Sequence, residues 1–185
     1  MFGWLSDHEY NNWIRQVEEN EISADQVRKT LKQRPDWVNF QDWKSVNAAP
    51  LLFHAKTIEV AKAMLECKAD PKVKDKFQRT LWFHANMAPP EVTRFILGHL
   101  GNIDEPDKDG DTAIHFHSRL HNPQCVKFLL DNKANPDIPN SRGRLPIQVV
   151  GTGPYHMPTQ ENQVFQLLVK VPESPPAPPV VTIRN

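Results

Sequence analysis

Short blocks of apolar residues, each spaced to cover one side of a helix, recur along the chain. Leu129 and Leu130 follow Val126 by three and four positions, which is the period of an amphipathic α-helix. Similar blocks occupy residues 60–65 and 92–97. Prolines stand between the blocks, and a proline inside a helix removes a hydrogen-bond donor and clashes with the preceding turn. The pattern therefore predicts a series of short helices rather than a few long ones.

The polar segments between these blocks resemble one another. Residues 107–115 match residues 140–148 at an offset of 33, and residues 75–83 precede the first of these by 32. A further copy begins near Pro50, at a shorter offset of about 30. One helix pair cannot bury its apolar side alone, so four copies at this spacing are expected to stack into a solenoid.

This repeat resembles the ankyrin repeat, in which a turn of the form D-x-x-G-x-T-P-L-H precedes two helices and a closing G-A-D-V-N segment. The best copy departs from that form at Ala113 and Lys133, and the copy from Asp75 has Gln78 in place of glycine. The resemblance implies an all-α fold, an ankyrin-type helix-pair solenoid with short turn or β-hairpin tips. The positions that carry it in the best copy are Asp107, Gly110, Thr112, Ile114, His115, Val126, Leu129, Leu130, Ala134 and Asn135.

The two ends of the chain differ from the repeats. Trp13, Ile14 and Val17 predict a helix over residues 7–19, and Ser23 with Gln26 forms a capping-box signature at the start of another. We therefore expect three regions: a helical N-terminal cap or divergent first repeat at 1–39, repeats at 40–171, and a Pro-rich tail at 172–185. The repeats divide approximately into 40–72, 73–104, 105–137 and 138–171, and the second helix of the last is expected at about 160–169.

Composition narrows the classes of partner. The 22 basic residues balance 22 acidic ones, so the formal net charge is zero, and a neutral chain has no global attraction for nucleic acid or anionic membrane. No apolar run approaches the length of a membrane span. Two cysteines are too few for a disulfide framework and favour a reducing compartment. These features predict a cytoplasmic protein that is monomeric alone and binds neither nucleic acid nor membrane.

Three histidines raise the question of a metal site or a small enzyme. His117 and His121 have the i, i+4 spacing that can share a zinc ion, and His115 lies two residues before His117. His115, however, occupies the histidine position of the ankyrin repeat, and the resemblance implies that its ring hydrogen bonds tie neighbouring turns together. No further ligand motif accompanies the group. We therefore predict no catalytic residue, no metal and no cofactor, and keep a histidine-based metal protein or small enzyme as an alternative.

The variable positions of the turns are the predicted site. In ankyrin-like solenoids the turn tips and first helices form a concave face, and here the turns mix acidic and basic side chains, which suggests a protein partner. The prediction is a non-enzymatic protein-interaction module, and the alternative is a regulatory adaptor or inhibitor acting through the tail at 172–185. The predicted contact residues are Trp43, Lys76, Phe77, Arg79, Lys108, Asp109, Asp111, Arg142, Arg144 and Tyr155.

Overall fold

A computed structural model describes residues 3–40, 51–84, 88–154 and 157–169. Its α-helices and short 3-10 helices alternate along the chain, and no strand occurs within the described ranges. The elements are α1 (Gly3–Glu18), α2 (Ala24–Gln33), η1 (Pro35–Trp37), η2 (Leu51–His54), α3 (Ile58–Glu66), η3 (Leu81–His84), α4 (Pro90–Leu97), α5 (Ala113–Arg119), α6 (Pro123–Asp131), η4 (Pro146–Val149) and α7 (Pro158–Val169).

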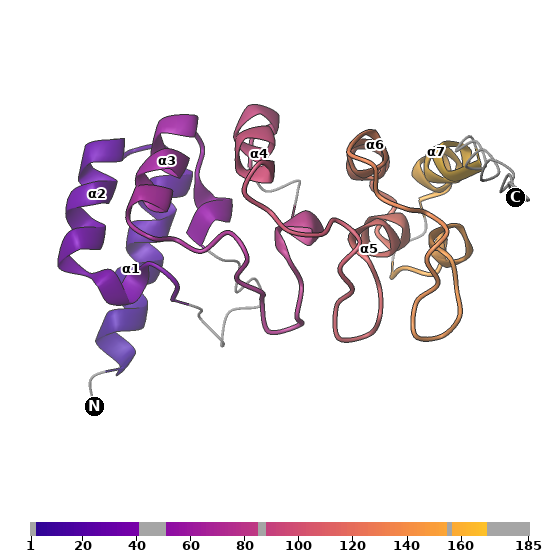
Figure 1. Ribbon diagram of the computed structural model, residues 1–185, viewed down its shortest axis with the longest axis horizontal. Coiled ribbons are helices and arrows are strands. Elements are labelled where there is room, and N and C mark those ends of the chain that lie inside the picture. The colour runs from indigo at the N-terminus through magenta and orange to yellow at the C-terminus, as the bar shows by residue number, and fades with distance from the viewer. Residues whose placement is uncertain (1–2, 41–50, 85–87, 155–156, 170–185) are drawn as a thin grey trace, which may run out of the picture.

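These elements form an elongated row of five helix pairs, so the predicted all-α solenoid is confirmed. The helices α2, α3, α4, α6 and α7 follow one another along one edge of the row, and the connecting turns project from the opposite edge (Figure 1). The helix α2 packs on α3, α3 on α4, and α6 on α7. The N-terminal helices occupy one end of the row and α7 the other (Figure 1).

The first element of most pairs is shorter than a regular helix. Among these first elements, α1 and α5 are α-helices, whereas η2, η3 and η4 are single 3-10 turns of four residues each. Local sequence accounts for the shortness of η4, because it is followed by Gly151 at φ 75° and then by a second glycine and Pro154. Such residues do not continue a helix, so the chain crosses to α7 through a loop.

Capping residues fix where the longer helices begin. The predicted capping box is present, since Ser23 Oγ accepts from the Gln26 amide at 3.3 Å and Gln26 Oε1 accepts from the Ser23 amide at 2.7 Å. Proline occupies the first position of α4 and α6, where its missing N–H group leaves nothing unsatisfied. The residues expected to cover the inner side of the first helix, Trp13, Ile14 and Val17, are buried.

The core consists of two apolar clusters that follow each other along the solenoid. The first runs from α1 to α4 and includes Leu51, Leu52 and Met64. The second runs from η3 to α7 and includes Ile114 and Leu129. Because the core extends along the row, each pair buries its apolar side mainly against its neighbours, and the turns at the opposite edge are held by polar contacts.

Candidate functional site

Three turns at the exposed edge share one hydrogen-bond pattern. In the second turn, Asp107 Oδ1 accepts from the amides of Asp109 at 2.9 Å and Asp111 at 3.1 Å, and the Asp107 amide donates to the Asp111 carbonyl at 2.8 Å. The first residue of each turn thus closes a five-residue loop with its own side chain, as Asn and Asp commonly do. The same contacts close the turns that begin at Asp75 and Asn140.

The fourth residue of each turn has left-handed backbone geometry. Gly110 and Gly143 have φ values of 77° and 70°, and Gln78 has φ 62° at the equivalent position. Glycine adopts this conformation without cost, whereas other residues are strained in it. The departure from the repeat at Gln78 therefore changes the residue but leaves the turn intact. The expected tips are turns of this kind, and no described tip residue belongs to a strand.

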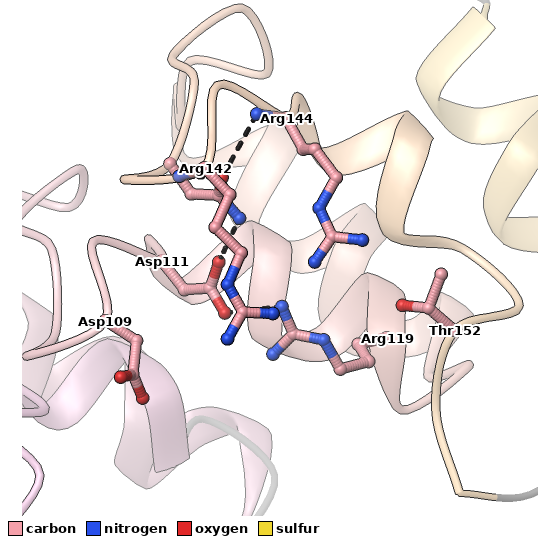
Figure 2. Close-up of a pocket in the computed structure, with 7 residues that line it drawn as sticks. Asp109, Asp111, Arg119, Arg142, Arg144 and Thr152 are labelled. Atoms are coloured by element: carbon pink, nitrogen blue, oxygen red, sulfur yellow. Dashed lines mark hydrogen bonds and ion pairs between the residues drawn. The ribbon is translucent and has the colours of Figure 1, made fainter.

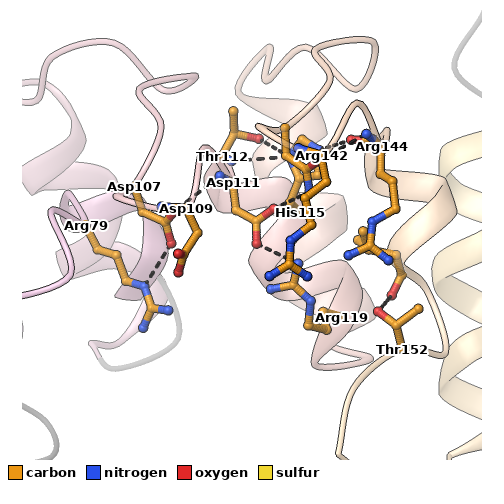
Figure 3. A network of polar contacts seen from close by, with 12 residues as sticks. Arg79, Asp107, Asp109, Asp111, Thr112, His115, Arg119, Arg142, Arg144 and Thr152 are labelled. Atoms are coloured by element: carbon orange, nitrogen blue, oxygen red, sulfur yellow. Dashed lines mark hydrogen bonds and ion pairs between the residues drawn. The ribbon is translucent and has the colours of Figure 1, made fainter.

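Side chains join each turn to the next. Arg79 Nε, from the fifth residue of the first turn, lies 3.3 Å from Asp107 Oδ2, at the first residue of the second. Between the second and third turns the direction is reversed, because Asn140 Nδ2, at the first residue of the third turn, donates to Asp111 Oδ1, at the fifth residue of the second, at 2.7 Å. Figure 3 shows these contacts as one continuous network. The fifth residue of a turn is thus bonded to the first residue of the next, and the three turns are held in a fixed row.

Two of the acids that the sequence places on the tips are buried within this row. Asp107 and Asp111 are 7% and 3% exposed, and Asp111 Oδ2 also accepts from Arg119 at 2.6 Å. Lys108, Asp109 and Arg142 remain exposed. The surface that a partner could reach is therefore more basic than the sequence pattern suggests, because the buried acids hold the turns together.

Cations surround an aromatic ring at the first turn. The Phe77 ring centroid lies 5.3 Å from Lys76 Nζ, 4.7 Å from Lys108 Nζ and 4.6 Å from Arg79 Cζ. Arg79 also stacks on Phe116 of α5 at 4.4 Å. The face of an aromatic ring attracts cations, so these predicted contact residues of the first and second turns are brought together in one cluster.

All the predicted residues of the second and third turns except Lys108 line a pocket. Its volume is about 420 Å³, and its walls are formed by Asp109, Asp111, Arg119, Asn140, Arg142, Arg144 and Thr152. Figure 2 shows the guanidinium groups of Arg119, Arg142 and Arg144 pointing into the same space. Sequence reasoning missed Arg119, although a signal was available: it lies four residues after His115 on α5 and therefore on the same side of that helix.

His115 connects the helix α5 to the third turn. Its Nδ1 accepts from the Thr112 amide at 3.2 Å, which places the ring proton on Nε2, and Nε2 donates to the Arg144 carbonyl at 2.9 Å. Burial lowers the pKa of His115, which favours this neutral form. The expected structural role of His115 is confirmed by these contacts.

The other two histidines of the group have separate surroundings. Burial lowers the pKa of His117 to about 4, and among the described residues neither of its ring nitrogens has a hydrogen-bond partner that meets normal geometry. His121 Nε2 lies 3.2 Å from the Gly151 amide, which donates to it. Across the described ranges, no three His, Cys, Asp or Glu side chains are placed to hold a metal ion together.

Two of the predicted contact residues, Trp43 and Tyr155, lie outside the described residues, as does the tail at 172–185. The remaining eight lie in or beside the row of turns. No described helix is both long and apolar enough to cross a membrane.

Comparison with known proteins agrees with this architecture. A stack of helix pairs with projecting turns defines the class of helical repeat proteins. A family model of ankyrin repeats matches residues 48–148 in three copies, more than half of the chain, and the protein belongs to that family. No curated protein matches the sequence significantly. Ankyrin repeats are in general protein–protein interaction modules and are typically without enzymatic activity.

Proposed function

We propose that this protein is a non-enzymatic interaction module that binds a partner protein through the row of turns and the adjoining first helices. The single observation that carries the proposal is the bonded row itself. Buried Asp107 and Asp111 lock the turns to one another, while Lys108 and Arg142 stay exposed. Burying charged side chains costs free energy, and a solvent-exposed loop that binds nothing does not require buried charges. A surface that is already rigid loses less entropy when a partner binds.

The chemistry of this surface suits a protein partner. Phe77 and the guanidinium group of Arg79 that lies on its ring are an aromatic residue and an arginine, side-chain types that are enriched at protein interfaces. The pocket between the second and third turns adds further arginines to this surface.

A compartment that keeps thiols reduced fits the free cysteines, Cys67 and Cys125. We propose that the protein acts in the cytoplasm as a monomer before it binds.

The test is affinity purification from the native cell, followed by mass spectrometry, with two charge-reversal variants. Lys108→Glu with Arg142→Glu changes the exposed tips, whereas Lys29→Glu with Lys32→Glu makes the same change of charge on exposed positions of α2. We expect the tip variant to lose the partner and the α2 variant to retain it, with unchanged thermal unfolding in both. Retention of the partner by the tip variant would contradict the proposal.

A further inference from the structure

We propose that the pocket between the second and third turns binds a carboxylate side chain of the partner protein. This inference rests on the proposed function and adds to it the chemistry of the group that is recognised. The pocket has a volume of about 420 Å³ and brings three guanidinium groups, those of Arg119, Arg142 and Arg144, to one space (Figure 2).

The three arginines differ in whether the chain already supplies an acceptor. Arg119 is paired with Asp111 at 2.6 Å. By contrast, the structure shows no hydrogen bond or ion pair from the Arg142 side chain to any described residue. Arg144 Nε is shielded from solvent and has no acceptor among the described residues. A charged donor that has lost water and gained no partner is energetically costly. Because Nε itself is closed to solvent, a ligand's oxygen can be bound only by the outer guanidinium nitrogens of Arg144 and by Arg142, which have no acceptor among the described residues.

The charge of the pocket selects the kind of acceptor. Three guanidinium groups face two carboxylates, those of Asp109 and Asp111, which leaves one positive charge. A single carboxylate balances it, whereas a phosphate group near pH 7 brings up to two negative charges. The planar guanidinium fork matches both oxygens of a carboxylate. An Asp or Glu side chain is thus the ligand that the pocket fits.

The backbone that carries these arginines is fixed before any ligand arrives. Asn140 Oδ1 accepts from the amides of Arg142 and Arg144 at 3.0 and 3.1 Å, and the Arg144 carbonyl accepts from His115 at 2.9 Å. On the other side, Gly153 approaches the Arg119 carbonyl so closely that a Cβ atom would collide with it. A pocket with fixed walls holds its donors ready, which lowers the entropy cost of binding.

The test follows the arginine side chains directly by NMR of the full-length protein. The Nε–H signals of Arg142 and Arg144 are monitored during titration with the peptide acetyl-Gly-Glu-Gly-amide, and in parallel with its glutamine counterpart. We expect saturable shifts with the glutamate peptide only. In Arg144→Gln, whose side chain makes no bond within the described fold, affinity should fall about tenfold, the effect of losing one charge-assisted hydrogen bond.

Three results would overturn the inference. Equal shifts with the glutamine peptide, or with sodium chloride at matched ionic strength, would show that no carboxylate is recognised. Tighter binding of inorganic phosphate or of a short single-stranded DNA than of the glutamate peptide would assign the pocket to another ligand. If the tip variant loses the partner while Arg144→Gln keeps the wild-type affinity for the peptide, this inference fails and the proposed function stands. If the tip variant retains the partner, the proposed function fails.

Discussion

The contact between Asp111 and Asn140 allows a sharp test of how the turns are joined. The first and second turns begin with aspartate, but the third begins with Asn140, whose amide donates to Asp111 Oδ1 at 2.7 Å. Both residues are buried, at 3% and 7% exposure. Aspartate at position 140 would still accept from the turn's own amides, as Asp107 does. Its second oxygen, however, would face the Asp111 carboxylate.

The size of the effect of Asn140→Asp depends on pH. Two like charges about 4 Å apart repel by about 4 kcal/mol at an effective dielectric constant near 20. At pH 7.5 protonating a carboxyl with an ordinary pKa near 3.9 costs about 5 kcal/mol, so both groups stay charged. The Arg119 guanidinium, 2.6 Å from Asp111, offsets part of the repulsion, so about 4 kcal/mol is the upper bound of the loss. At pH 4.5 protonation costs only about 1 kcal/mol, and the new group can then donate to Asp111. Folding raises the pKa of the carboxyl introduced at position 140, so the loss of unfolding free energy caused by Asn140→Asp grows as pH rises.

Urea denaturation at both pH values measures this difference. The free energy of unfolding of Asn140→Asp is compared with that of the wild type at pH 7.5 and at pH 4.5. Asn122→Asp is the matched control, because Asn122 Oδ1 accepts from the Cys125 amide at the start of α6, a carboxylate serves that N-cap position equally well, and no acidic side chain is bonded to Asn122 in the described structure. A penalty that is the same at both pH values, or below about 1 kcal/mol at pH 7.5, would refute the proposed coupling between the turns.

Three further predictions concern stability and reactivity. Because burial lowers the pKa of His117 from 6.5 to about 4, the unfolded chain binds the extra proton between these values, and stability falls by about 3 kcal/mol as pH decreases from 6.5 to 4. Urea denaturation of His117→Leu should lack that part of the decrease. Gln78→Gly should raise the free energy of unfolding by about 1 kcal/mol, because it removes left-handed backbone strain. Gly110→Ala should lower the free energy of unfolding, because the alanine Cβ would lie 2.6 Å from the Ser141 nitrogen. Thermal denaturation measures both effects. Burial raises the pKa of the Cys125 thiol to about 11, so mass spectrometry after iodoacetamide treatment should find the less buried Cys67 modified first.

The turns and the repeat could be predicted from the sequence because they depend on local chemistry. An aspartate that closes a turn and a residue that accepts left-handed geometry lie within five positions of each other. The pattern survives even at Gln78, where φ is 62°. The role of His115 could likewise be predicted from the resemblance alone, and its contact with the Arg144 carbonyl agrees with it.

Burial of the turn acids could not be predicted in the same way. Asp111 and Asp109 both look like surface acids in the sequence, yet Asp111 contacts the third turn and Asp109 is exposed. The difference arises only when turns about 30 residues apart stack against each other. For the same reason the mixed signs along the sequence did not reveal that Asp111 is buried, whereas the predicted contact residues Lys108 and Arg142 are exposed.

Site-directed photo-cross-linking in the native cell tests the central claim most directly. A photoreactive amino acid is placed at Lys108 or at Arg142 on the tips, and at Lys29 on α2, all of which are exposed. The proposed binding surface predicts that both tip positions cross-link to the same protein and that position 29 does not. Cross-linking of the partner from position 29 alone would place the interface on the opposite edge of the solenoid and contradict the claim.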